Sequence, residues 1–157
     1  MKTSPLQLKH YVLTRLHIEP REEPSINPTD PASLELPDWE GVNLRSKIDF
    51  AWADGEAEPR SFAMRLRLTV PNETGKPIPY SLDVETVGYF EISEAIEIKD
   101  RENIGKVNGA SMLYGICREV FFSLTARFPQ VPIILPSMNF FDLKTAPDSS
   151  GESAKRQ

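Results

Sequence analysis

The segment YSLDVETVGYFEI, residues 80–92, alternates apolar or small residues with mostly polar ones along its whole length. Successive side chains of a β-strand point to opposite faces of a sheet, so a period of two predicts a strand with one covered and one wet face. This alternation is typical of antiparallel sheets, because strands of parallel sheets are usually apolar on both faces. The segment therefore predicts an antiparallel sheet that is covered on one side.

Three earlier segments repeat the alternation, at residues 6–18, 42–52 and 62–70. The stretches 54–60 and 71–79 are rich in turn-forming residues and short enough for hairpins. We therefore predict four strands in one antiparallel sheet. The covered face of the first strand is expected to hold the following residues: Leu6, Leu8, His10, Val12, Thr14, Leu16 and Ile18.

A long helix is predicted after the sheet, at residues 108–128, whose apolar residues recur at helical spacing over one broad face. The charged stretch before it, 93–107, fits either a short helix or an irregular link. Four residues of the broad face are expected to contact the sheet: Leu113, Ile116, Val120 and Leu124. Phe122 lies on the far side between small residues, where a helix exposed to water would carry polar ones. We therefore expect a contact with another subunit through Gly115, Phe122 and Ala126.

The link from the first to the second strand, residues 19–41, contains five prolines and is much longer than a hairpin needs. It also carries Leu34, Leu36 and Trp39, which a purely solvated linker would lack. We interpret this link as a crossover that lies on apolar surface and forms one wall of a groove.

The composition limits the class of protein and its partners. The formal net charge of −5 disfavours nucleic acid and anionic membrane surfaces, because both select cationic proteins. One cysteine excludes an internal disulfide and a metal site built from cysteines. We see neither an apolar signal segment nor a run of about 18 apolar residues, and we expect a cytoplasmic protein without membrane insertion. We expect one domain over residues 1–143 and a disordered polar tail over 144–157.

Residues that could carry chemistry are few. His10 and His17 are seven residues apart in one predicted strand, so they are expected on opposite faces and cannot share a metal ion. We expect His10 in the interior or in an interface, and His17 at the surface. Cys117 falls on the apolar face of the helix, where a cysteine is typically a small hydrophobic residue rather than a nucleophile.

Asp83 and Glu85 lie two residues apart on the polar face of the last strand, about 7 Å from each other. This spacing suits a carboxylate pair for acid–base catalysis. It also suits cross-strand ion pairs, because arginine and lysine residues occupy polar positions of the neighbouring strands. We favour the ion pairs, and we expect no enzyme activity, no metal site and no cofactor.

Two motifs, ASMLYGICREV at residues 110–120 and LPSMNF at residues 135–140, are specific enough for a comparison with known families. The first resembles the helix start, and the second the A-P-V-N-F motif, of SecB, the cytoplasmic export chaperone of bacteria, and its SecB-like relatives. The family also has four strands, a long first crossover with a tryptophan just before the second strand, and then the helix. The resemblance extends from Leu6 to about Leu143.

The resemblance implies an α+β protein whose four-stranded antiparallel sheet is covered on one face by a long C-terminal helix and which assembles as a dimer of dimers. It also implies a holdase chaperone that binds unfolded polypeptides without ATP and keeps them competent for export. The groove positions carried over for client binding are Leu34, Leu36, Trp39, Leu44 and Tyr80. Glu19 and Asp83 match acidic positions that dock the motor SecA, and Glu85 lies beside them.

Departures from the family open other functions. Arg15 and Ser81 stand where the family has an acid and a leucine, and a short polar tail replaces its longer C-terminal helix. One alternative is a SecB-like chaperone that guards the antitoxin of a toxin–antitoxin pair. A second is an enzyme or small-ligand-binding protein that uses the cavity between crossover and sheet. A third is an adaptor that binds one folded partner through the acidic face of the sheet.

Overall fold

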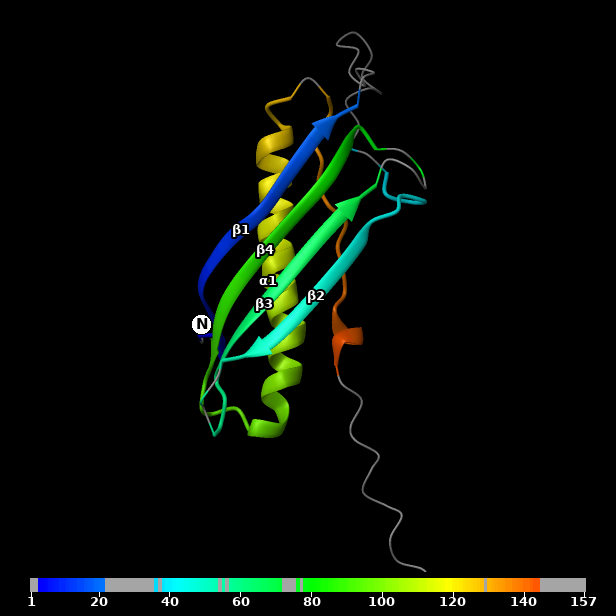
Figure 1. Cartoon of the computed structure of the whole chain (residues 1–157). Coiled ribbons are helices and arrows are strands. Elements are labelled where there is room, and N and C mark those ends of the chain that lie inside the picture. The colour runs from blue at the N-terminus through cyan, green and yellow to red at the C-terminus, as the bar shows by residue number, and fades with distance from the viewer. Residues whose placement is uncertain are drawn as a thin grey trace, which may run out of the picture.

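The computed structural model describes residues 3–21, 36, 38–53, 55, 57–71, 76, 78–128 and 130–144. Its elements, in chain order, are strands β1 (Leu6–Pro20), β2 (Arg45–Trp52), β3 (Ser61–Val70) and β4 (Tyr80–Ile92), helix α1 (Ile98–Thr125) and the 3-10 helix η2 (Phe141–Leu143). The four predicted strands and the α+β class are therefore confirmed (Figure 1).

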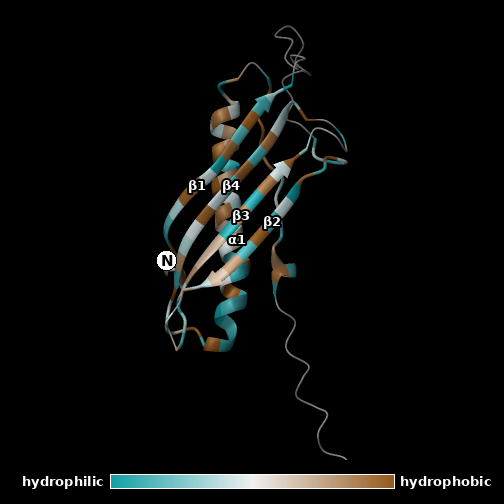
Figure 2. Cartoon of the chain, viewed as in Figure 1, coloured by the Kyte–Doolittle hydropathy of each residue, from teal (hydrophilic) through white to brown (hydrophobic). Residues whose placement is uncertain are grey.

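The four strands form one antiparallel sheet in the order β1-β4-β3-β2. The two predicted hairpins join β2 to β3 and β3 to β4, which are neighbours in the sheet. The first link carries the chain from one edge of the sheet to the other, because β1 and β2 are the two edge strands. Apolar and polar residues alternate visibly along the strands in Figure 2.

Helix α1 begins at Ile98, ten residues before the start predicted from the sequence. The charged stretch 93–107 is therefore mostly helical, rather than a short helix or irregular link of its own. Its sheet-facing side uses glycine in place of large apolar residues: a Cβ on Gly105 would lie 3.1 Å from the ring of Phe62. Aromatic rings of the sheet thus fill the space that helix side chains usually occupy, and no apolar periodicity marks this part of the helix.

The stripe of α1 that faces the sheet differs from the prediction. Leu113 is fully buried as expected, but Ile116, Val120 and Leu124 are only half-buried. The buried residues in this part of the helix are Ala110, Leu113, Tyr114, Cys117, Phe121 and Thr125. The stripe includes a polar residue because the Thr125 hydroxyl donates to the carbonyl of Phe121 and accepts from the amide of Ile133.

A second segment covers the inner face of the sheet beside α1. After the helix the chain reverses direction, and residues 130–140 run back beside it towards η2 (Figure 1). This segment buries Val131, Ile133, Leu135 and Phe140. It is tied to the helix by the Tyr114 hydroxyl, which donates to the carbonyl of Pro136 at 2.6 Å.

Strand β1 does not keep the phase predicted from its sequence. Its pairing with β4 shifts between Leu8 and His10 and again between Leu13 and Arg15. Each β-bulge adds one residue to β1, and one extra residue exchanges the two faces of a strand. Between the two bulges, the side chains of β1 therefore point to the face opposite to the one predicted.

The reversal corrects four expectations. His10, Val12 and Thr14 do not belong to the covered face: His10 is exposed and stands opposite Tyr89 on the outer side. His17 stands opposite Asp83, also on the outer side, so the two histidines share a face. Their partners in β4, Tyr89 and Asp83, are six residues apart. The two histidines are therefore about 20 Å from each other, which is still too far to share a metal ion.

Candidate functional site

The inner face of β2 is only partly covered. Helix α1 packs mainly against β4, β1 and β3. The inner-facing side chains of β2 are half-buried at Ile48, Phe50 and Trp52. Large apolar residues at an edge strand, half-open to solvent, mark a candidate binding surface.

The aromatic rings behind this surface form a continuous layer. Phe50 stacks on Phe62 with ring centroids 4.7 Å apart, and Phe62 stacks on Phe90 at 4.9 Å. Trp52 meets Phe50 and Phe62 edge-on, at 5.0 and 5.6 Å. The half-exposed rings of β2 are thus held rigidly by the buried rings of β3 and β4.

A cavity of about 580 Å³ lies between β2, α1 and η2, and we call it the aromatic groove. It is lined by Ile48, Asp49, Phe50, Trp52, Glu102, Lys106 and Leu143. The Lys106 ammonium lies 5.7 Å from the Phe50 ring centroid and forms an ion pair with Glu102. The groove therefore combines an aromatic floor with a charged rim on the helix side.

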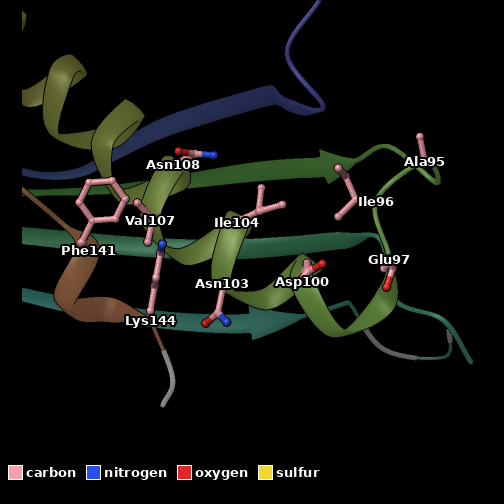
Figure 3. Close-up of a pocket in the computed structure, with 10 residues that line it drawn as sticks. All are labelled: Ala95, Ile96, Glu97, Asp100, Asn103, Ile104, Val107, Asn108, Phe141 and Lys144. Carbon is pink, nitrogen blue, oxygen red and sulfur yellow. The ribbon is translucent and has the colours of Figure 1, made fainter. Parts of the chain in front are cut away.

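A second cavity, of about 500 Å³, lies on the other side of η2, and we call it the helix pocket. Figure 3 shows its lining: Ala95, Ile96, Glu97, Asp100, Asn103, Ile104, Val107, Asn108, Phe141 and Lys144. Phe141 is 58% exposed and lies under the Lys144 ammonium at 4.7 Å. Leu143 lines the first cavity and Phe141 the second, so η2 separates two hollows that both expose apolar side chains.

This arrangement suits binding of apolar side chains better than covalent chemistry. Burial raises the pKa of the Cys117 thiol to about 12, so this side chain is not a thiolate nucleophile near neutral pH. The expectation of a small hydrophobic cysteine is confirmed, because Cys117 has no exposed surface. Among the described residues, no cluster of three His, Cys, Asp or Glu side chains could hold a metal ion.

The groove residues carried over from the family do not gather at the aromatic groove. Trp39 and Leu44 pack partly buried against the core before the start of β2, and the Trp39 indole donates to the carbonyl of Ile134 at 2.8 Å. Trp52 is the last residue of β2, about 23 Å along the strand from its start. Leu36 is 52% exposed.

Tyr80 is fully buried, and its hydroxyl donates to the carbonyl of Thr125 at 3.4 Å. Burial also raises the pKa of Tyr80. Leu34 lies outside the described residues, as does the predicted tail from residue 145 onward. The role of these positions in client binding stays a prediction.

The residues that sequence reasoning missed are Phe50 and Trp52. The alternation placed both on the covered face of a strand, which is where they lie. Their exposure follows from the position of β2 at the sheet edge and from the path of α1. This exposure could have been predicted only with knowledge of the strand order, which puts β2 at the edge of the sheet.

The predicted docking carboxylates lie together on the outer face of the sheet, but two of them are paired with arginines. Arg67 donates two hydrogen bonds to Asp83, each 2.9 Å long, and an Arg15 nitrogen lies 3.5 Å from the same carboxylate. Arg67 therefore holds the pKa of Asp83 below its ordinary value. Glu85 accepts a 2.7 Å hydrogen bond from the Thr14 hydroxyl.

The favoured interpretation of Asp83 and Glu85 as cross-strand partners is confirmed, since an Arg65 nitrogen also lies 3.9 Å from Glu85. Glu19 is exposed near the end of β1, with a carboxylate oxygen 3.4 Å from the His17 ring. On the far side of α1, Phe122 is 44% exposed, Ala126 is exposed, and a Cβ on Gly115 would meet nothing within 4 Å. This second helix face is thus uncovered in the protomer, and its role in assembly stays a prediction.

No family model matches the chain. A protein of Methanocaldococcus jannaschii, "Uncharacterized protein MJ0357", is 28% identical over 101 residues. The match covers 64% of this chain and 64% of that protein, so the chain matches less than two thirds of the length of its curated relative.

Comparison of the structure gives a clearer result. The SecB-like chaperone Rv1957 of Mycobacterium tuberculosis, solved in complex with a ChAD peptide from the Rv1956 HigA1 antitoxin, superposes with a TM-score of 0.50 and 19% identity. The match covers 85% of this chain and 91% of that one. A protein of unknown function from Streptococcus agalactiae also has a TM-score of 0.50, with 12% identity and coverages of 84% and 97%. The chain therefore shares the fold of a SecB-like chaperone.

In the described part of the chain, no helix is long and apolar enough to cross a membrane.

Proposed function

We propose that the protein is a SecB-like holdase chaperone that binds unfolded or partly folded polypeptide segments in the aromatic groove. The observation that carries the proposal is the row Ile48, Phe50 and Trp52, whose half-buried side chains line a cavity of about 580 Å³ on this fold. Apolar burial is non-directional and contributes about 25 cal/mol per Å², so such a surface accepts many sequences. The binding needs neither ATP nor a cofactor, and no catalytic group takes part.

The edge position of β2 supports the same proposal. An extended client segment can pair its main chain with an edge strand, which adds affinity that does not depend on client sequence. Its alternate side chains would then enter the aromatic groove beside Phe50 and Trp52. Asp49, Glu102 and Lys106 at the rim keep the empty groove wetted.

For the partner, we favour a dedicated antitoxin over a general export client handed to SecA. The similar chaperone Rv1957 was solved with an antitoxin peptide, which supports this choice. Asp83 and Glu85, which would face the motor, are already paired with Arg67, Arg15 and Arg65. A pull-down from the native host distinguishes the two: one small dedicated partner supports the antitoxin, and SecA supports export.

Intrinsic fluorescence tests where a client binds, because the chain has two tryptophans. In the Trp39→Phe variant, Trp52 alone reports on the aromatic groove. We expect its emission to shift to shorter wavelength when a denatured model protein is added. In the Trp52→Phe variant, Trp39 should not respond. A response from Trp39 alone would move the client site to the crossover.

Suppression of aggregation tests the holdase activity itself. We expect the protein to prevent aggregation of the denatured model protein at stoichiometric ratio. The Trp52→Ser variant should bind the client about tenfold more weakly, since buried aromatic anchors dominate such surfaces. The control Met138→Ser also removes a half-exposed apolar side chain and should have no effect. Absence of any suppression by the correctly assembled protein would refute the proposal.

We also propose that the protein assembles as a homotetramer, a dimer of dimers. Two uncovered apolar surfaces support assembly: Tyr11, Leu13 and Leu16 on the inner side of β1, and Phe122 on the far face of α1. We expect Phe122→Glu and Gly115→Leu to lower the oligomeric state measured by light scattering, and Met138→Glu to leave it unchanged. An unchanged oligomer in both interface variants would exclude this helix face.

A further inference from the structure

The outer face of the sheet is divided into two halves of different chemistry. On the half near the start of β4, the register brings together charged residues of all four strands. The charged residues of this half are the cations Arg15, Arg45, Lys47, Arg65 and Arg67 and the carboxylates Glu19, Asp49, Asp83 and Glu85. We call this surface the basic half. Cations outnumber carboxylates there, although the whole chain has a net charge of −5.

Two carboxylates of the basic half, Asp83 and Glu85, are satisfied within the sheet. Asp83 lies between Arg67 and Arg15, and Glu85 accepts from Thr14 and lies near Arg65. These contacts leave the carboxylates little capacity to attract a cationic partner.

The cations of β2 have weaker contacts. Lys47 stands directly opposite Arg67, and its side chain is 75% exposed with its ammonium 4.0 Å from Asp49. Arg45 is also exposed. Opposed like charges and a long, exposed ion pair leave positive potential at this edge of the outer face.

The other half of the outer face carries apolar residues next to the basic half, and beyond them the ion pair of Lys9 and Glu91. Val12 pairs with Val87, and in the next row His10, Tyr89, Ala63 and Ala51 follow one another across the sheet. Tyr89 is 47% exposed and Val12 37% exposed, and the rings of His10 and Tyr89 stack with centroids 6.3 Å apart. This row borders directly on the row that contains Arg65.

We propose that the outer face docks a polypeptide segment that is acidic and carries an aromatic or aliphatic residue. The acidic side chains would pair with Arg45 and Lys47, and the apolar residue would pack on Tyr89 and Val12. A polypeptide fits better than a nucleic acid, because a continuous phosphate chain would meet the carboxylates that are interspersed on this face. This surface lies on the opposite side of the sheet from the aromatic groove, so it is independent of client holding.

Binding of a labelled synthetic peptide made of glutamate and phenylalanine tests this proposal by fluorescence anisotropy. We expect binding that weakens as salt is added. Arg45→Glu combined with Lys47→Glu should weaken it about tenfold, through loss of attraction and added repulsion. These two residues are chosen because neither holds Asp83 or Glu85. Tyr89→Ser should also weaken binding, by loss of the apolar contact.

The matched control combines Lys99→Glu with Arg127→Glu. Both residues are exposed on the helix side of the protein, and the change in net charge is the same. The control should bind the peptide normally, and the Trp52 response to a client should be unchanged in all variants. Equal weakening in the control, salt-independent binding, or tighter binding of a basic peptide or a single-stranded oligonucleotide would overturn the proposal.

Discussion

Strands β1 and β4 are paired along their whole length, but their inner-facing side chains have different surroundings. In β4, Leu82 and Val84 are at most 2% exposed, because α1 packs against this strand. In β1, Tyr11 and Leu16 are 44% and 46% exposed, since this strand forms an edge of the sheet. The central strand therefore stabilises the protomer, and the edge strand leaves apolar surface for a partner.

Truncation of one leucine in each strand should give the largest difference. We expect Leu82→Ala to lower the free energy of unfolding by about 3 kcal/mol, because it leaves a cavity in the core. Leu16→Ala should cost less than about 1 kcal/mol, because its side chain is largely solvated in the protomer. Urea denaturation at low protein concentration measures both values.

Protein concentration sharpens this test. If a second copy covers Leu16, the cost of Leu16→Ala should rise with concentration, since assembly stabilises only the folded state. The cost of Leu82→Ala should stay the same. Equal costs at low concentration would contradict the contrast between the two strands.

The difference between the strands also explains which part of the fold could be predicted. The bounds of β4 followed from alternation alone, because every second side chain is buried. In β1 the residues Tyr11, Val12 and Leu13 are consecutive and apolar. The sequence therefore does not determine which of them face the inner side of the sheet. The two bulges are fixed by pairing with β4, which a single strand does not encode.

The candidate site was less predictable than the fold. The alternation of residues 42–52 puts Phe50 and Trp52 on the covered face of β2, but their exposure depends on where α1 crosses the sheet. The start of α1 was missed because Gly105 meets the ring of Phe62 where a periodic helix would carry a large side chain. Both errors concern contacts between distant segments, and local patterns do not contain them.

Gly88 provides the next test of the contrast, because it faces α1 from β4 and stands opposite Tyr11 in β1. A Cβ at this position would lie 2.7 Å from a methyl carbon of Leu113 and from the ring of Phe90, both of which are buried. We expect Gly88→Ala to lower the free energy of unfolding by about 2 kcal/mol. Thermal or urea denaturation measures the effect.

Gly115→Ala is the matched control for this substitution. Nothing lies within 4 Å of a Cβ there, and alanine favours a helix over glycine, so the variant should be more stable by about 0.5–1 kcal/mol. A neutral or stabilising Gly88→Ala would show that β4 and α1 are less closely packed than the contrast requires.

Substitutions that remove an ion pair of β4 should have the smallest effects on the free energy of unfolding. Arg67 holds the pKa of Asp83 below its ordinary value of 3.8, mainly through two hydrogen bonds. A lowered pKa in the folded state contributes stability above pH 3.8, which is lost as the pH falls through the folded value. We expect Asp83→Asn to lower the free energy of unfolding at neutral pH by roughly 0.5–1 kcal/mol, because the pair is bidentate but partly exposed.

The pH dependence separates this electrostatic effect from a packing effect. The difference between the parent protein and Asp83→Asn should shrink as urea denaturation is repeated at pH values falling below 3.8, since protonation removes the same charge. Glu91→Gln is the control at the β1 side of β4, where Lys9 lowers the pKa of Glu91 but the pair is more exposed. Its effect should be smaller at every pH. A difference for Asp83→Asn that persists in acid would mean that shape and hydrogen bonding, not charge, hold β3 against β4 at this position.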